Sequence, residues 1–400
     1  MFARLLPILG ITFIDILGFS ILIPILPYYV LHFGAPDWQV GALFATFAFC
    51  QFIGGPIWGN VSDRIGRKAV LIISQIGATI GWAMLAFAPT LFWVFVARVI
   101  EGFSGGNISV TQAYVADRVE PEQRPRAFAY VGAAFSAGLV FGPAAGGLLL
   151  EHFGYATPFL LAAGLQVVTL LLTIFFLPET VAAHSKKQET ATFRDILRYF
   201  REPRIAPTLA QKLAYSLGLY AWFAAFALFL KAVLHFGPTS TSYAFSAFGV
   251  ISVVMQLFAV GRIVGGATTG LGVRRASNLG FFLGCLFFVI VPFVSSFTAL
   301  MLTMLLFSAT LALSNATLPE LLTAAVPEHV RGTVLGVGSS LESISGSIMP
   351  IVSTAILAVY GPSWAGALSA FFVFIALGIG LVMQRRERGN PPAGEASASS

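Results

Sequence analysis

Four ionisable residues lie well inside long apolar stretches of the sequence, where they could bind and release protons. They are Asp15, Arg98, Glu101 and Glu342. A charge at the centre of a bilayer costs about 2.5–3.5 kcal/mol on insertion scales, so each residue needs a function or a fixed partner. Burial disfavours a charged carboxylate and a nearby cation favours it, so a change in hydration can move a proton. We expect a carboxylate among them to couple proton movement to another event, with Asp15 as the first candidate, Glu101 as the second and Glu342 as the third, and with Arg98 as the cation that tunes them.

A structural role is the second interpretation of two of these residues. Arg98 and Glu101 are three positions apart, so they can touch on one face of a helix and form a fixed ion pair. Asp15 could make a polar contact between helices instead of carrying a proton. Arg98 is the one deep basic residue that the sequence indicates, which makes phosphorylated anions poor ligands for such a site.

The composition is that of an integral membrane protein. Of the 400 residues, 57% are hydrophobic and 10% are charged, and the mean hydropathy is +0.85. A soluble domain would carry about 25% charged residues. Cys50 and Cys285 lie in apolar runs, so we expect no disulfide framework and no metal site. Apolar stretches of about 20 residues or more predict twelve membrane-spanning helices, with approximate bounds 5–31, 39–61, 69–88, 91–115, 127–150, 155–177, 206–235, 243–266, 276–295, 298–325, 332–359 and 362–384.

The basic residues indicate the orientation of these spans. Twenty of the 23 lysines and arginines fall at the N-terminus or in the loops after even-numbered spans, a set in which we include Lys212 at the end of the central linker. By the positive-inside rule, both termini lie in the cytoplasm. The net charge of +6 is therefore a signal of orientation, and no nucleic-acid partner is expected.

The chain divides into two sets of six spans that repeat one another. We predict an N-terminal bundle at 1–177, a cytoplasmic linker at 178–205, a C-terminal bundle at 206–384 and a disordered tail at 385–400. Phe193, Ile196, Leu197 and Phe200 recur at helical spacing in the linker and predict an amphipathic helix on the inner leaflet. At a constant offset of 207 residues, Gly77 matches Gly284, Pro143 matches Pro350 and Gly154 matches Gly361. Such a repeat is typical of transporters whose binding site lies between two rocking halves at the membrane midplane.

Several short motifs accompany this pattern. The loop after the second span holds glycines that permit a tight turn, together with mixed charges, at Gly59, Asp63, Arg64, Gly66, Arg67 and Lys68. This spacing resembles the loop signature of the major facilitator superfamily. Arg98 with Gly102, the glycine run in the fifth span and Pro178-Glu179-Thr180 also resemble motifs of that family. The resemblance implies an all-α membrane protein with twelve transmembrane helices in two pseudo-symmetric six-helix bundles.

The first 180 residues also look like those of the tetracycline-type drug:proton antiporters. The similarity lies in Phe13-Ile-Asp15-Ile-Leu-Gly18, in Pro24 with Pro27, and in Gln51 with Pro56. That subfamily carries acidic residues in its third and ninth helices. Here Gly81 and Trp82 occupy the matching stretch of the third span, and the ninth span has no acid. This departure argues against tetracycline itself as the substrate.

The resemblance implies a cytoplasmic latch, a set of contacts that closes the inner side of the transporter. Asp63 would face the start of the eleventh span near Gly332. Arg67 or Arg64 would pair with Asp117 or Glu120 below the fourth span. These contacts would stabilise the outward-facing state.

The fifth span carries Gly138, Gly142, Pro143, Gly146 and Gly147. Small residues at this spacing allow close packing, which we expect to be against a helix of the other half. The resemblance to antiporters implies a second role, in which this face seals against ion leak and bends at Pro143.

Polar and aromatic side chains within the spans are candidates for the substrate cavity, namely Gln51, Asn107, Gln112, Tyr215, Tyr220, Trp222, Gln256 and Asn315. Such a cavity suits amphiphilic molecules that are weakly cationic or neutral.

The resulting prediction is a proton-driven exporter of lipophilic small molecules, as in multidrug or tetracycline-like efflux. It would lie in the inner membrane as a monomer, which is the usual form in the family that it resembles, with H⁺ as the coupling ion and no other cofactor. An importer or facilitator of a small metabolite is the alternative on the same fold, and a non-transporting receptor-like protein is a further one. No enzyme is expected, because no motif places a nucleophile beside a histidine base.

Overall fold

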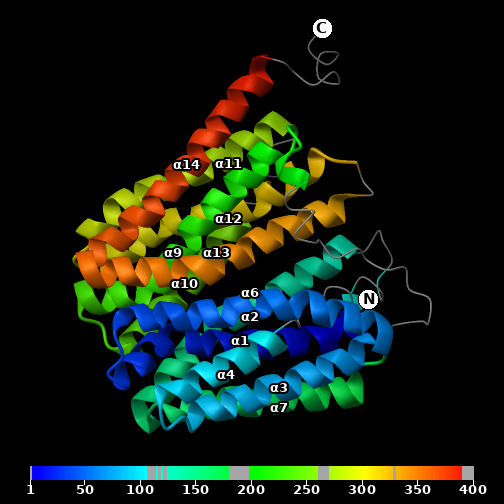
Figure 1. Cartoon of the computed structure of the whole chain (residues 1–400), viewed down its shortest axis with the longest axis vertical. Coiled ribbons are helices and arrows are strands. Elements are labelled where there is room, and N and C mark those ends of the chain that lie inside the picture. Colours follow the sequence, from blue (N-terminus) through cyan, green and yellow to red (C-terminus); the bar gives the residue numbers. More distant parts are fainter. Residues whose placement is uncertain are drawn as a thin grey trace. The chain divides into compact units, whose positions relative to one another are not determined.

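The computed structural model describes residues 2–105, 114–115, 119, 124–179, 198–259, 270–327 and 330–389. Within these residues the chain forms twelve α-helices of 14 to 31 residues (Figure 1). They are α1 (Phe2–His32), α2 (Asp37–Ile65), α3 (Arg67–Ala86), α4 (Leu91–Ser104), α6 (Arg124–Phe153), α7 (Ala156–Phe176), α9 (Ala206–Leu234), α10 (Pro238–Ala259), α11 (Gly270–Ile290), α12 (Phe297–Ala324), α13 (Arg331–Tyr360) and α14 (Pro362–Gly389). A 3₁₀ turn, η3 (Val291–Phe293), follows α11.

Eleven of these helices are long and apolar enough to cross a membrane. The twelfth, α4, has 14 residues and ends at Ser104, with Gly105 as its C-cap. Residues 106–113 of the predicted span 91–115 lie outside the described residues. A bilayer offers the backbone no hydrogen-bond partners, so an apolar span satisfies its own N–H and C=O groups by forming a helix. The predicted all-α membrane class is therefore confirmed.

Glycines end two equivalent helices in the same way. Gly154 follows α6 with φ +79°, and Gly361 follows α13 with φ +93°. This left-handed conformation costs little for glycine and ends a helix cleanly. The two residues are partners at the predicted offset of 207, so the repeat extends to backbone conformation.

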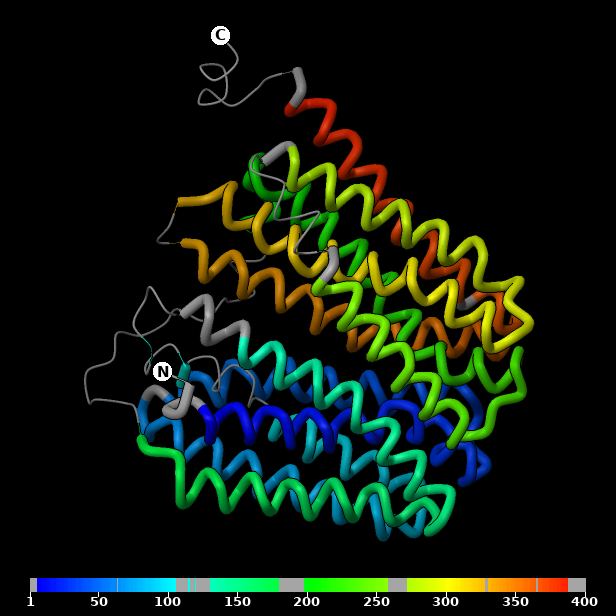
Figure 2. The backbone as a smooth tube through the Cα atoms, turned by 180° about the vertical axis from the view of Figure 1, so that it is seen from behind, coloured from blue at the N-terminus to red at the C-terminus, as the bar shows by residue number. Residues whose placement is uncertain are grey.

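Helix packing repeats as well. In the first half of the sequence α3 packs against α4 and α7, and in the second half α11 packs against α12 and α14. Gly77 of α3 faces Ser104 of α4, while its repeat partner Gly284 of α11 faces Thr310 of α12. The course of each of these helices can be followed along the tube in Figure 2.

The chain separates into two compact units, each built from more than one segment. The first unit contains the described residues of Met1–Thr190 together with Ala224–Val250 and Gly346–Val359, and the second contains those of Ala191–Phe223, Ile251–Ser345 and Tyr360–Ser400. Within the first unit, the Tyr28 hydroxyl lies 2.8 Å from the Phe236 carbonyl oxygen and 2.7 Å from the Thr241 hydroxyl. The sequence boundaries at 177 and 205 follow chain order and stay a prediction. The expectation of a disordered tail from residue 385 was wrong for residues 385–389, because α14 continues as a helix to Gly389.

The described end of the central linker packs against α9, α12 and α13. Residues 192–197 of the predicted amphipathic helix lie outside the described residues. Tyr199 is buried in an apolar cluster with residues of α9, α12 and α13, and Phe200 packs against the same cluster. This described end of the linker is therefore part of the second unit's core.

Candidate functional site

The loop between α2 and α3 turns at one glycine. Gly66 has φ +103°, a conformation that glycine adopts easily. The chain therefore turns within one residue, so that α2 ends at Ile65 and α3 begins at Arg67. The Gly66 N–H donates to the Ser62 carbonyl oxygen at 3.1 Å, and Arg67 Nη1 donates to Ser62 Oγ at 2.5 Å. Ser62 Oγ in turn donates to the Gly59 carbonyl oxygen at 2.7 Å. Three of the predicted signature residues, Gly59, Gly66 and Arg67, are thus joined in one turn by hydrogen bonds to Ser62.

The carboxylate of Glu179 caps the N-terminus of α3. The backbone N–H of Arg67 donates to Glu179 Oε1 at 3.0 Å, and that of Lys68 donates to Oε2 at 3.1 Å. The Lys68 ammonium adds a bond of 2.7 Å to the Ile174 carbonyl oxygen on α7. A side chain at Gly66 would overlap this carboxylate. Glu179 belongs to Pro178-Glu179-Thr180, which resembles a family motif, and its contact is this cap of α3.

Replacing Glu179 by glutamine isolates the charge of this cap. Because a carboxylate at an exposed helix N-terminus contributes about 0.3–1 kcal/mol, we expect Glu179→Gln to lower the thermal midpoint slightly and to weaken its dependence on salt. Unfolding of the purified protein at low and high ionic strength measures both effects. Glu202→Gln, at an exposed position outside the helices, is the control; equal shifts in the two variants would contradict the cap.

The other half of the predicted latch is not described. Asp117 and Glu120 lie outside the described residues, and so does the side chain of Asp63. Arg64 is exposed at the end of α2, and Gly332 lies in the first turn of α13. The pairing of Arg64 or Arg67 with an acid below α4 therefore stays a prediction.

Asp15 lies in α1, where the glycines of α6 pack. Its side chain is partly buried, and its Oδ1 atom is inaccessible to solvent. A Cβ atom at Gly138 would lie 2.9 Å from the Phe13 carbonyl oxygen and from the Leu17 nitrogen, on either side of Asp15 along the chain. Ser20 Oγ donates to the Gly138 carbonyl oxygen at 2.8 Å, which fixes the two helices together.

We expected the four glycines of this face to pack against a helix of the other half of the sequence, and this prediction was wrong for three of them. Gly138, Gly142 and Gly146 face α1, which belongs to the same half of the sequence. Gly147 does face a helix from the other half, since a Cβ atom there would lie 2.7 Å from Ser242 Cβ in α10. Pro143 is buried inside α6 between these contacts. The contacts explain the small residues by close packing, and the proposed sealing of a leak is a separate role.

Gly142 offers a test of this packing. A Cβ atom at Gly142 would overlap Ser20 Oγ and press on the Leu17 carbonyl oxygen, whereas one at Gly132 of the same helix meets nothing within 4 Å. Overpacking costs about 1–3 kcal/mol, so Gly142→Val should lower the thermal midpoint and the yield of folded protein. Gly132→Val is the matched control and should resemble the wild type. If both variants were equally stable, the tight contact of α1 with α6 would be refuted.

Arg98 and Glu101 form a buried ion pair on α4. Their side chains are 1% and 4% exposed, respectively. The Arg98 guanidinium also lies 5.5 Å from the ring centre of Phe47 and 5.4 Å from that of Trp82. Aromatic faces at this distance attract a cation. Among the described residues, Arg98 is therefore held by one acid and two rings.

Gly81 makes room for this pair. A Cβ atom at Gly81 of α3 would overlap the Glu101 side chain. Gly81 and Trp82 are the residues that stand where the resembling subfamily carries an acid. In this chain, that part of α3 receives the carboxylate of Glu101 from the neighbouring helix.

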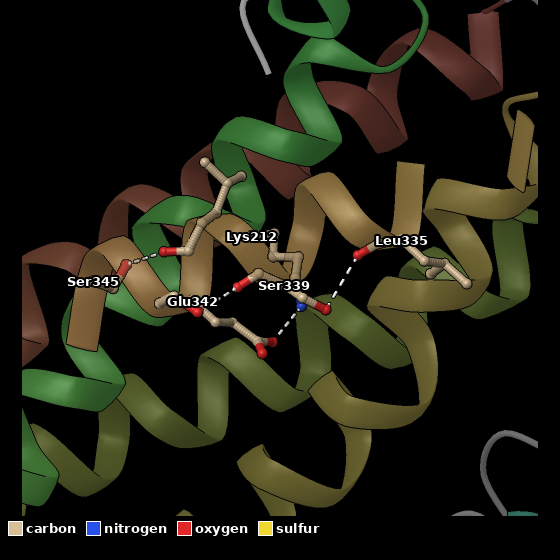
Figure 3. Close-up of polar contacts among 7 residues, drawn as sticks. Lys212, Leu335, Ser339, Glu342 and Ser345 are labelled. Atoms are coloured by element: carbon tan, nitrogen blue, oxygen red, sulfur yellow. Dashed lines mark hydrogen bonds and ion pairs between the residues drawn. The ribbon is translucent and has the colours of Figure 1, made fainter. Parts of the chain in front are cut away.

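A second ion pair lies in the other unit and joins α9 to α13. Lys212 Nζ lies 2.5 Å from Glu342 Oε1, and Figure 3 shows the two side chains pointing toward each other. The Lys212 side chain is 11% exposed and that of Glu342 is 43% exposed. The prediction that Lys212 belongs to the end of the linker was wrong, because Lys212 lies inside α9. Arg98 is consequently not the single deep cation, and the partner of Glu342 is Lys212.

The predicted cavity residues divide by exposure. Tyr215 and Trp222 of α9 are buried, at 4% and 1% exposed, and Trp222 packs edge-on against Phe287 and Phe288 of α11. Tyr220 is partly buried. Gln256 of α10 and Asn315 of α12 are exposed.

The remaining cavity candidates lie in the first unit or outside the described chain. Gln51 Nε2 donates to the Gly105 carbonyl oxygen at 3.1 Å, so it holds the end of α4. Asn107 and Gln112 lie outside the described residues. Packing thus accounts for Trp222 and Gln51, while Gln256 and Asn315 are exposed and Tyr220 is partly buried.

Comparison with known sequences places the chain among proteins of matching length. It is 29% identical over 373 residues to the class C tetracycline resistance protein of Escherichia coli, which covers 90% of this chain and 91% of that protein. It is 28% identical over 403 residues to multidrug resistance protein 2 of Bacillus subtilis (strain 168), with 96% of each chain covered.

Solved structures show the same fold. The human organic anion transporter MFSD10 (TETRAN) matches with a TM-score of 0.71 and 21% identity, over 94% of this chain and 99% of that one. A bacterial homolog to the human lysosomal transporter Spinster, in an inward-facing and occupied conformation, matches with a TM-score of 0.78 and 13% identity, over 95% and 96%. At these identities the likeness concerns the fold alone.

A family model described as Major Facilitator Superfamily matches residues 8–264 and 213–399, which together take in both halves of the chain. The twelve helices, the repeated packing of α3 and α11, and the glycine turn between α2 and α3 agree with that match. The chain belongs to the Major Facilitator Superfamily.

Proposed function

We propose that this chain is a secondary active transporter that exports lipophilic or amphiphilic small molecules in exchange for protons. The observation that carries the proposal is the buried pair of Arg98 and Glu101, which are 1% and 4% exposed inside the helical part of the chain. Charges in such a position are costly and are kept where they serve ion or proton movement. Asp15 and Glu342 add two further carboxylates within membrane-spanning helices.

Each charged residue has a proposed role in the exchange. Asp15 is the first candidate for the group that binds and releases the proton, Glu101 is the second and Glu342 is the third. Arg98 tunes Glu101, with which it is paired. The turn at Gly66 and its cap by Glu179 hold the cytoplasmic latch in shape.

The relatives support export over import. Those compared above carry names that refer to tetracycline resistance and multidrug resistance. Gly81 and Trp82 replace the acid expected in the third helix, so we propose a neutral or weakly cationic amphiphile and not tetracycline as the substrate. We further propose an inner-membrane location with both termini in the cytoplasm and a monomeric state. No enzymatic activity is expected.

Reconstitution tests this function directly. The purified chain is placed in liposomes that enclose a pH-sensitive dye, and a panel of lipophilic compounds is added on one side. Exchange predicts a pH change inside that depends on both the compound and the protein. If no compound in a broad panel caused proton movement, the proposal would be contradicted. Proton movement in the same direction as the compound would favour import.

A further inference from the structure

A groove opens in the second unit between the beginning of α9 and the end of α14. It has a volume of about 460 Å³, and its lining includes Pro207 and Ala210 of α9 together with Gly378, Val382 and Arg386 of α14. Arg386 is the one ionisable residue in this lining, and the others are apolar. The groove is therefore an apolar channel with a cation in its wall.

The α14 wall of the groove belongs to a face that contacts lipid. Ile375, Gly378 and Val382 follow one another at helical spacing and share one face of α14. The Ile375 side chain is 38% exposed and that of Val382 is 52% exposed, within a helix that is long and apolar enough to cross a membrane. Large apolar side chains that stay exposed on such a helix are covered by acyl chains. A lipid is thus the molecule that the bilayer places over the groove.

Arg386 lies at the depth of the lipid headgroups. It stands 24 positions after Pro362, the first residue of α14, so at 1.5 Å per residue it is about 36 Å along the helix axis. The hydrocarbon core of a bilayer is about 30 Å thick. Gly378 lies eight positions before Arg386, about 12 Å deeper along the axis. The groove therefore extends from the acyl chains to the headgroups.

The charge of Arg386 is not neutralised by a neighbouring acid. Glu387, the next residue, is paired with Arg274 of α11, whose Nε atom lies 2.6 Å from Glu387 Oε1. The other wall of the groove, α9, contains no acidic residue. Arg386 is exposed, and no acid among the described residues is paired with it. The charged end of the groove thus suits an anion.

We propose that this groove binds an anionic phospholipid, with the phosphate on Arg386 and the upper part of an acyl chain against Gly378 and Val382. A guanidinium can donate two parallel hydrogen bonds to a phosphate. A basic pocket between membrane-spanning helices at the headgroup level is a typical site for an anionic lipid. The inference requires only a bilayer around the chain, so it does not depend on the transported compound or on the direction of transport.

A second groove on the protein provides an internal comparison. It lies between α3 and α4, has a volume of about 380 Å³ and is lined by apolar residues alone, among them Ile80, Phe87 and Trp93. An acyl chain can occupy it, but its lining offers no cation to a headgroup. The α3–α4 groove should therefore accept lipids without regard to their charge, whereas the α9–α14 groove should prefer an anionic one.

Photo-crosslinking in nanodiscs tests this difference. The full chain is placed in phosphatidylcholine nanodiscs that contain a trace of either phosphatidylglycerol or phosphatidylcholine, each with the same diazirine-bearing acyl chain. Labelled peptides are identified by mass spectrometry after illumination. One arginine near an anionic headgroup corresponds to about fivefold in binding, so phosphatidylglycerol should label residues 207–210 and 378–386 about fivefold more than phosphatidylcholine does. The two lipids should label the α3–α4 groove equally.

Two outcomes of this comparison would overturn the proposal. One is equal labelling of the α9–α14 groove by the two lipids. The other is loss of the phosphatidylglycerol label in excess inorganic phosphate, because the groove would then be a site for free phosphate and not for a lipid. Neither outcome depends on proton movement in liposomes, so this inference and the proposed function can fail separately.

Replacing Arg386 tests the headgroup contact. Arg386→Gln should remove the preference for phosphatidylglycerol, so that its label at the α9–α14 groove falls about fivefold. Arg385→Gln is the matched control, because Arg385 is exposed on the same helix turn and is not part of the lining. It should keep the preference. A preference that survived in Arg386→Gln would refute the assignment.

Replacing Gly378 tests the acyl-chain contact. A Cβ atom at Gly378 meets nothing within 4 Å, so Gly378→Leu should fold as the wild type does and fill the groove with its side chain. Both lipids should then label the α9–α14 groove less, while the α3–α4 groove stays labelled. Gly164→Leu, at an equally open and exposed position of α7, is the control and should change neither label. Unchanged labelling in Gly378→Leu, at a thermal midpoint equal to that of the wild type, would show that no acyl chain lies in the groove.

Discussion

Glu101→Gln is expected to lower the free energy of unfolding by about 3–5 kcal/mol, because it leaves the buried Arg98 guanidinium without its acid. Both side chains are almost fully enclosed, so solvent cannot replace the lost carboxylate. The rings of Phe47 and Trp82 attract the cation but do not neutralise it. Glutamine keeps the size of glutamate, which fits against Gly81, so the loss comes from charge and not from shape.

A double variant separates the structural role of the pair from its role in exchange. Replacing a buried ion pair by apolar residues of similar volume is often neutral or stabilising, so Arg98→Met/Glu101→Met should recover the thermal midpoint that Glu101→Gln loses. If the pair also moves protons, the stable double variant should still fail to exchange. Thermal unfolding in detergent and proton flux in liposomes measure the two effects. A fully stable Glu101→Gln variant would contradict the buried pair.

Hydropathy alone was enough to predict the fold class. Apolar stretches must become helices in a bilayer, and the positions of the helices follow from that requirement. The repeat could be predicted because matched glycines have the same role in both halves. Gly154 and Gly361 each end a helix, and Gly77 and Gly284 each allow a close contact between helices.

Contacts between helices that are distant in the chain could not be predicted from the sequence. The glycine face of α6 was recognised by its spacing, but spacing does not specify which helix packs against it, and α1 was the partner of Gly138, Gly142 and Gly146. The cap by Glu179 joins residues more than a hundred positions apart, as does the pair of Lys212 with Glu342. Such pairings depend on the tertiary arrangement of whole helices.

The position of Lys212 shows why basic residues near a span end are ambiguous. Lys212 is close in sequence to the linker, whose basic residues indicate the orientation of the chain, yet it lies inside α9. A usable signal was present, since Leu209 and Leu213 flank it at helical spacing within the predicted span 206–235. A lysine at such a position calls for an acidic partner, and Glu342 is that partner.

Asp15→Asn is expected to remove compound-driven proton movement and to leave folding intact. Asparagine keeps the size of the side chain and one of its two acceptor oxygens, so the shape of the α1 surface changes little. It cannot exchange a proton, and loss of a proton-transfer group typically costs about 100-fold or more in rate. Glu151→Gln, at an exposed position at the end of α6, is the matched control and should exchange as the wild type does.

Proton flux into liposomes that hold either the wild type or Asp15→Asn at equal protein content is the most direct test of proton-coupled export. The account predicts that compounds which drive flux through the wild type drive none above the empty-liposome background through Asp15→Asn. Equal flux through the two proteins would contradict it.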